Sequence, residues 1–194
     1  MDSSLKQMAA AVKGQIARMK QALKDAGYNP ASIREQVAGL ALRYGSPALD
    51  VGTGARACLA TTMAQHGMTV TAVDHALRAV HDAQEVAREQ IGRLEVQHAD
   101  AAHLPFPDNT YRVVAAFDSL CHVADPVAVI KEMFRVCDYR GAVIITELNT
   151  DGRHLTQHKD VGFDEKIPIL LAPHCHDCKQ LNSAHHVTFV CEKN

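Results

Sequence analysis

The feature that most constrains the fold is a glycine turn between an apolar strand and a helix. Gly52, Thr53 and Gly54 follow the short apolar segment 48–51 and precede a helical pattern over residues 56–65. Glycines at such a place let the backbone approach a ligand closely, and the amino terminus of the following helix faces that ligand. The turn therefore predicts a strand–turn–helix unit that binds a nucleotide-like cofactor.

The segments around this turn alternate between apolar strands and helices. Strands are expected at residues 48–51, 69–73, 94–97, 111–117 and 142–148, and helices at residues 56–65, 75–91 and 127–137. Strands separated by helices of this length require right-handed crossovers and hence a parallel sheet. The pattern predicts an α/β fold with a doubly wound, mostly parallel, Rossmann-like sheet.

Both ends of the chain add elements to this core. Helices are expected at residues 4–26 and 31–43, and the apolar stripe of the first should pack on the core while its lysines face solvent. Residues 186–191 predict a last strand. Residues 166–171 are a weaker strand candidate, because Pro168 would confine it to a sheet edge.

Charge and composition exclude several classes of protein. The 194 residues carry 20 Lys and Arg against 22 Asp and Glu, a net charge of −2, which disfavours binding to nucleic acid or to an anionic membrane by bulk attraction. The chain has no apolar run of about 18 residues, so no transmembrane helix is expected. Its first residues lack a signal-peptide pattern, so a cytoplasmic location is expected. The six cysteines are then expected to be reduced thiols.

Two cofactors fit the glycine turn, NAD and S-adenosylmethionine. Asp74 ends the second strand twenty residues after Gly54, where a carboxylate can bond ribose hydroxyls of either cofactor. Asp50 separates them, because its charge would repel a pyrophosphate and attract the α-ammonium of S-adenosylmethionine. At 4 Å and an effective dielectric of 20 the interaction is worth about 4 kcal/mol in either direction. This favours S-adenosylmethionine, with a nicotinamide-dependent oxidoreductase as the rival.

The same residues carry a resemblance to a known family. Asp50-x-Gly52-x-Gly54 with Asp74 resembles the first two motifs of class I S-adenosylmethionine-dependent methyltransferases. Residues 100–109 and 117–123 resemble the subgroup related to ubiquinone and menaquinone C-methyltransferases. The likeness covers about residues 45 to 148 and implies methyl transfer to a small-molecule acceptor. A protein that binds the cofactor or its demethylated product without catalysis stays as the alternative.

The resemblance also implies roles for individual residues. Asp50 would approach the methionine end of the cofactor, the two glycines would form the floor, and Asp74 would bond the ribose. Asp100 would reach the adenine amino group, Ala101 would offer its backbone N–H to the ring, and Phe117 and Asp118 would line the methionine side. The full implied cofactor set is Asp50, Gly52, Thr53, Gly54, Asp74, His75, Asp100, Ala101, Phe117 and Asp118.

Departures from the family pattern occur at three places, and none removes a cofactor contact. Arg56 stands where a third glycine is common, Arg112 replaces a frequent aspartate, and residues 137–141 replace a Pro-Gly turn.

The family's leading helices often resemble a lid, which would make residues 1–44 a helical lid over the methyltransferase domain 45–194. Only about 45 residues follow the fifth strand, which is short for the family's closing helix and two strands. The acceptor pocket is therefore expected to be incomplete, open or finished by a partner chain, as in a homodimer.

His122 is the candidate catalytic residue, because it should leave the fourth strand near the sulfonium. It would act as a general base if the acceptor carries a proton that must leave, and a packed structural histidine is the alternative. Glu147 and Asn149, at the end of the fifth strand, are secondary candidates for contact with the acceptor.

The tail holds a second group of reactive side chains. Residues 174–178 read His-Cys-His-Asp-Cys, with His185, His186 and Cys191 downstream, and these are zinc ligand types. A single Cys-x-x-Cys pair is a weak pattern, so a partly exposed loop without a metal site is expected. A structural metal, or a soft metalloid acceptor bound by the cysteines, stays open.

Overall fold

The computed structural model describes residues 3–90, 92–158, 162–175 and 177–193. Its centre is a seven-stranded sheet of order β3-β2-β1-β4-β5-β7-β6, in which β7 runs antiparallel to both neighbours and the other pairs are parallel. The strands are β1 (Ala48–Val51), β2 (Val70–Asp74), β3 (Leu94–His98), β4 (Tyr111–Phe117), β5 (Cys137–Leu148), β6 (Cys178–Asn182) and β7 (His186–Glu192). The doubly wound, mostly parallel sheet predicted from the sequence is confirmed.

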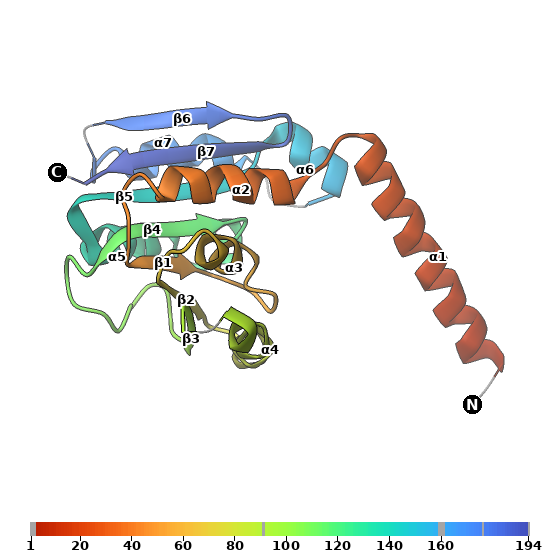
Figure 1. The fold of residues 1–194 in the computed structure, drawn as a ribbon. Coiled ribbons are helices and arrows are strands. Elements are labelled where there is room, and N and C mark those ends of the chain that lie inside the picture. The colour runs from red at the N-terminus through yellow and green to blue at the C-terminus, as the bar shows by residue number, and fades with distance from the viewer. Residues whose placement is uncertain (1–2, 91, 159–161, 176, 194) are drawn as a thin grey trace.

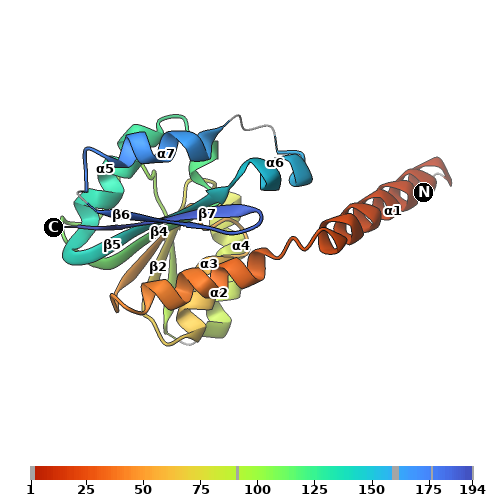
Figure 2. The same cartoon turned by 90° about the horizontal axis from the view of Figure 1, so that it is seen from above.

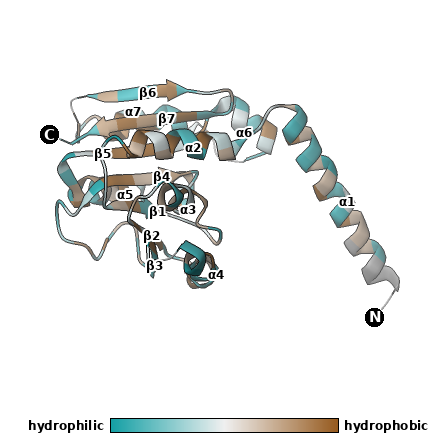
Figure 3. Cartoon of the chain, viewed as in Figure 1, coloured by the Kyte–Doolittle hydropathy of each residue, from teal (hydrophilic) through white to brown (hydrophobic). Residues whose placement is uncertain are grey.

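Helices cover both faces of the sheet (Figure 2). They are α1 (Ser3–Asp25), α2 (Pro30–Ala41), α3 (Cys58–Gln65), α4 (Leu77–Ala87), α5 (Pro126–Val136), α6 (Thr150–Thr156) and α7 (Phe163–Leu171), with short 3-10 turns η1 (Arg88–Gln90) and η2 (Leu120–His122). Helices α2, α3 and α4 share one apolar core, and α5 and α7 share the other. Figure 3 shows that the hydrophobic residues concentrate on the strands between these layers.

Local signals explain where several helices begin. Proline occupies the first position of α2 and of α5, where its missing N–H costs nothing. The side chains of Asn29 and Asp125 cap these helices by accepting from the N–H groups of Ser32 and Ala128. The predicted helix 75–91 ends earlier, at Ala87, and passes into η1, while Ile91 lies outside the described residues.

Helix α1 projects away from the body of the protein (Figure 1). Met8, Val12, Ile16 and Met19 are 44–64% exposed, so the expectation that its apolar stripe packs on the core is wrong. No described residue of α1 lines a cavity at the sheet. Helix α2 does pack inward, through the buried residue Val37. The lid over residues 1–44 stays a prediction.

The carboxyl-terminal part differs most from the expectation. Residues 166–171 belong to helix α7 and not to a strand, because Phe163, Ile167 and Leu171 repeat every four residues and are all buried. Pro168 sits on the exposed side of this helix. Helices α6 and α7 and strands β6 and β7 follow β5, so helices and two strands do close the fold, and the expectation of an incomplete acceptor pocket stays a prediction.

Cysteine pairing is a further correction. Strand β6 begins at Cys178, within the segment expected to be a loop, and the β6–β7 register places Cys178 directly opposite Cys191. The two form a disulfide, so the expectation of reduced thiols is wrong for this pair. Cys58, Cys121, Cys137 and Cys175 remain thiols. Among the helices that the structure describes, none is both long and apolar enough to cross a membrane.

Candidate active site

A cavity of about 710 Å³ lies at the carboxyl ends of the parallel strands, where the chain order reverses between β1 and β4. Ligands of open α/β sheets bind at this place, and the volume suits a small-molecule cofactor. Eight of the predicted residues line it, namely Gly52, Gly54, Asp74, His75, Asp100, Ala101, Asp118 and His122. Asp50, Thr53 and Phe117 are not among the lining residues.

The two glycines of the turn serve different purposes. Gly52 has φ +75°, and a Cβ there would lie 2.6 Å from the Cβ of Ser119, so the site has no room for a side chain. Ser119 is held in place by its hydroxyl, which donates to the Val51 carbonyl (2.9 Å). Gly54 has φ +63°, and a Cβ there would meet no described neighbour within 4 Å, so its backbone is open to the cavity. Gly52 thus makes the turn possible, and Gly54 leaves space for a ligand.

Asp74 ties the glycine turn to the next helix. Its Oδ2 accepts from the Gly54 N–H and its Oδ1 from the Ala76 N–H, both at 2.9 Å. The carboxylate therefore faces the cavity from a fixed position at the end of β2. His75 follows it with an exposed side chain whose Nδ1 lies 3.7 Å from Asp74 Oδ1.

Asp50 lies behind the turn. It is 2% exposed, and its Oδ2 accepts from the Thr53 hydroxyl (2.7 Å) and from the Ala60 N–H at the start of α3 (3.2 Å). Burial raises the pKa of Asp50 to about 6, against the lowering effect of these two hydrogen bonds. The structure thus shows Asp50 and Thr53 bracing the turn, and their contact with a cofactor stays a prediction.

The loop after β3 brings Asp100 and Ala101 to the opposite wall of the cavity. Asp100 accepts from the Ala102 N–H (2.9 Å) through Oδ1 and lies 3.0 Å from His103 Nδ1 through Oδ2. The hydrogen bond with His103 is the main cause that lowers the pKa of Asp100. The carboxylate is exposed and bonded within its own loop, so a ligand in the cavity can reach it directly.

At the end of β4 the chain places two predicted residues on different sides. The Phe117 ring lies between the Arg34 guanidinium, 5.6 Å from its centroid, and the His186 ring at 5.5 Å, away from the cavity. Asp118 turns the other way through a left-handed backbone (φ +49°). Its Oδ2 lies 3.2 Å from His186 Nε2, and its buried Oδ1 has no hydrogen-bond partner among the described residues.

A smaller chamber of about 210 Å³ adjoins the cofactor cavity and shares Asp118 and His122 with it. Glu147 lines this chamber and accepts from the N–H groups of Ser119 (3.2 Å) and Leu120 (2.8 Å), and its contact with an acceptor stays a prediction. Burial and then the charge of Asp118 raise the pKa of Glu147 to about 7. The chamber is therefore an acidic recess next to the cofactor cavity.

Sequence reasoning missed several residues of this chamber. Tyr28, Cys121, Arg153 and His158 line it. Arg153 is buried and paired with Asp164, and it also donates to the Leu148 carbonyl (2.9 Å). Of these four residues, only Cys121 could have been suspected from the sequence, because it lies next to His122. The other three reach the site from segments whose fold was not predicted. Asn149 does not line either cavity; it caps α6 by accepting from the Gly152 N–H (2.9 Å).

The fold, the glycine turn and the cavity at the switch point define a class I S-adenosylmethionine-dependent methyltransferase fold. Residues 49–145 match the family described as a methyltransferase domain, which is half of the chain, so the protein belongs to this family. The subgroup resemblance also has support, because a demethylmenaquinone methyltransferase of Geobacillus sp. is 38% identical over 64 residues, covering 33% of this chain and 27% of that protein.

Other comparisons agree on the fold. A phosphatidylethanolamine N-methyltransferase of Cereibacter sphaeroides is 32% identical over 120 residues, covering 59% of this chain and 56% of that protein. A solved structure of a methyltransferase from Aquifex aeolicus superimposes with a TM-score of 0.64 at 17% identity, covering 89% of this chain and 97% of that chain. The chain therefore spans 56% of the length of the Cereibacter relative and 27% of the length of the Geobacillus relative.

Proposed function

We propose that the protein transfers a methyl group from S-adenosylmethionine to a small-molecule acceptor that binds in the smaller chamber. The observation that carries this proposal is that two adjoining cavities share Asp118 and His122. The larger cavity is lined by the glycine turn, and we place the transferred group where the smaller one adjoins it. When bound, the cofactor supplies an electrophilic methyl group on a sulfonium whose leaving thioether needs no acid.

The residues of this chain would mainly bind and orient. We assign ribose contact to Asp74, adenine contact to Asp100 and the Ala101 N–H, and the methionine side to Asp118, whose buried Oδ1 lacks a partner among the described residues. The open backbone at Gly54 fits a ligand that lies against the turn. Asp50 and Thr53 would support this floor from behind. Holding donor and acceptor in line in a water-poor pocket can supply much of the rate acceleration.

His122 is the residue that we place at the reacting centre. It lies on η2 and lines both cavities, so its ring can reach a group that spans them.

The same proposal includes residues 1–44 as a helical lid in front of domain 45–194. It also includes a cytoplasmic location, a homodimer and the absence of a nucleic-acid partner, the last supported by the near-balanced charge.

Binding experiments test the proposal directly. We expect S-adenosylmethionine and its demethylated product to raise the melting temperature, and NAD to leave it unchanged. At a ligand concentration 100-fold above Kd the stabilisation should be about 2.7 kcal/mol. A cell extract supplied with radiolabelled methyl donor should then yield a labelled small molecule. Stabilisation by NAD alone would show that the cofactor assignment is wrong, and binding without any labelled product would favour a non-catalytic binding protein.

A further inference from the structure

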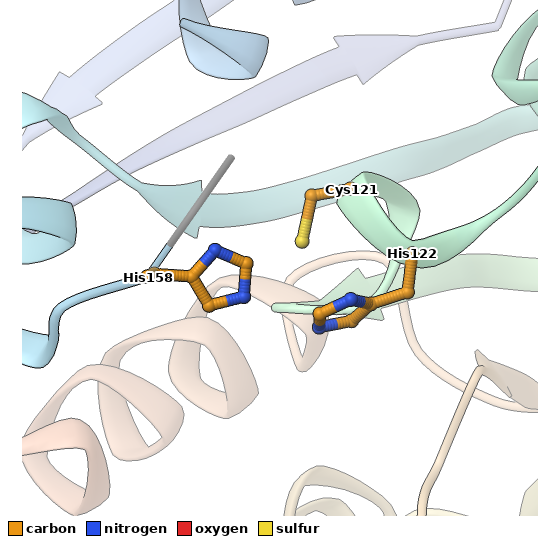
Figure 4. A group of neighbouring side chains, drawn as sticks. All are labelled: Cys121, His122 and His158. Atoms are coloured by element: carbon orange, nitrogen blue, oxygen red, sulfur yellow. The ribbon is translucent and has the colours of Figure 1, made fainter. Parts of the chain in front are cut away.

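We infer that Cys121, His122 and His158 form a binding site for a zinc ion, which would hold a hydroxyl- or thiol-bearing acceptor next to the methyl donor. Figure 4 shows the three side chains converging, with Cys121 and His122 on η2 and His158 on the segment after α6. The inference rests on the proposed function, because it concerns the acceptor side of the same site.

The geometry suits a metal ion. One ligand atom from each residue lies within 4.8 Å of the other two, and the centroids of the two imidazole rings are 5.0 Å apart. Around a tetrahedral zinc ion with bonds of 2.0–2.3 Å, ligand atoms lie about 3.3–3.6 Å apart. The ligand atoms of these side chains therefore need to approach one another by no more than about 1.5 Å. Rotation about their χ angles can supply this, since His122 is exposed and the other two are only partly buried.

The donor set indicates the kind of metal and of site. Two imidazoles and a thiolate form a borderline-soft set that suits zinc, and three protein ligands leave a fourth position open, as catalytic zinc sites do. The Cys121 thiol also hydrogen-bonds the Glu147 carboxyl group. Once the thiol has lost its proton to bind the metal, it can only accept, so a protonated Glu147 would donate to the sulfur from behind, as outer-shell partners do.

The surroundings favour a cation. Asp118 and Glu147 line the same chamber, and the guanidinium of Arg153 is already paired with Asp164. Because His122 lines both cavities, while Cys121 and His158 line only the smaller one, a metal held by all three would lie at the boundary between donor and acceptor.

This position selects a chemical class of acceptor. A zinc ion lowers the pKa of a bound O–H or S–H group, so the acceptor loses its proton to water on binding. The bound oxygen or sulfur then forms a bond to the methyl carbon. The sulfonium–methyl bond breaks at the same time, and its electron pair stays on the sulfur as a neutral thioether. Under this inference His122 binds the metal and does not accept the proton.

Cobalt(II) is a suitable probe, because cobalt bound to a thiolate gives a charge-transfer absorption band. We would titrate metal-free, untagged protein under non-reducing conditions and expect one equivalent of cobalt to bind with this band, and zinc to displace it. Cys121→Ser should abolish the band, and His158→Ala should weaken cobalt binding at least tenfold. Cys175→Ser is the matched control for the other cysteine cluster, in which Cys178 and Cys191 are already joined, and His154→Ala controls for an exposed histidine. Both should behave as the unmodified protein.

The outcomes separate this inference from the proposed function. Absence of the band, or a band that survives Cys121→Ser and is lost in Cys175→Ser, would overturn the metal site. Calorimetry with S-adenosylmethionine should give the same Kd for Cys121→Ser as for the unmodified protein, and failure of the unmodified protein to bind would instead refute the proposed function. An acceptor panel completes the test, because turnover of amines or carbon nucleophiles alone, with no alcohol, phenol or thiol methylated, would contradict the acceptor class.

Discussion

Replacing Gly52 by alanine should destabilise the protein through two separable effects. The left-handed backbone at φ +75° costs a residue with a side chain about 1–2 kcal/mol. The new Cβ would also lie 2.6 Å from the Cβ of Ser119, and overpacking of this kind costs about 1–3 kcal/mol. We therefore expect Gly52→Ala to lower the free energy of unfolding by roughly 2–5 kcal/mol. Gly54→Ala is the matched control, because it has a similar φ and no described neighbour within 4 Å.

Urea denaturation of both variants measures the backbone cost and the overpacking cost. The Ser119→Gly variant completes a double-mutant cycle with Gly52→Ala. Gly54→Ala should cost only the backbone term, about 1–2 kcal/mol, but should weaken binding of S-adenosylmethionine because the methyl group enters the space open to the ligand. In the Ser119→Gly background the clash is gone, so Gly52→Ala should cost no more than Gly54→Ala does. Equal losses for the two glycine variants in the unmodified background would refute the reasoning.

Three further predictions concern the acidic chamber and its neighbours. Burial raises the pKa of Glu147 to about 7 in the folded protein. The folded state therefore binds more protons than the unfolded state between about pH 4.5 and 7. The free energy of unfolding should fall as the pH rises through that range. The loss of unfolding free energy should be roughly 3 kcal/mol. Urea denaturation at each pH should give a smaller loss for Glu147→Gln. The same dependence of unfolding free energy on pH in both proteins would contradict the burial of Glu147. Arg153→Met should cost about 3–5 kcal/mol by leaving Asp164 without its partner, and Asp164→Leu in the same chain should restore much of this, which thermal and urea unfolding would show. His122→Ala should lower turnover at least about 100-fold while the Kd for the cofactor, measured by calorimetry, stays within a few-fold; equal losses in both would remove His122 from the reacting centre.

The position of Asp50 shows how a correct conclusion can follow from an incomplete argument. The preference for S-adenosylmethionine over NAD assumed that this carboxylate lies beside the ligand, yet it is buried behind the turn and bonded to Thr53 and Ala60. The carboxylates that line the cavity are Asp74, Asp100, Asp118 and Asp125, and the first three lie at or just after the ends of β2, β3 and β4. The acidic character near the cofactor therefore comes mainly from the ends of three other strands, and family membership supports the cofactor independently.

The two cavities differ in how far the sequence predicts the residues that line them. The cofactor cavity uses residues that come directly after strands, so their position follows once the strands and their parallel order are known. The smaller chamber draws Tyr28 from the segment before α2 and Arg153 and His158 from the region of α6, and none of these residues comes directly after a strand. Their approach depends on how α6 packs against the end of β5.

The amino-acid order alone determined the parallel strands, the helices between them, the glycine turn and eight of the residues that line the larger cavity, because local periodicity and backbone freedom act over a few neighbouring residues. Two features were decided only by tertiary structure, namely the placement of α1 and the pairing of Cys178 with Cys191. The disulfide depends on a contact between two strands, and the placement of α1 depends on the absence of contacts between its exposed apolar residues and the core. The same holds for the meeting of Cys121 and His122 with His158, which brings η2 and the segment after α6 to one point.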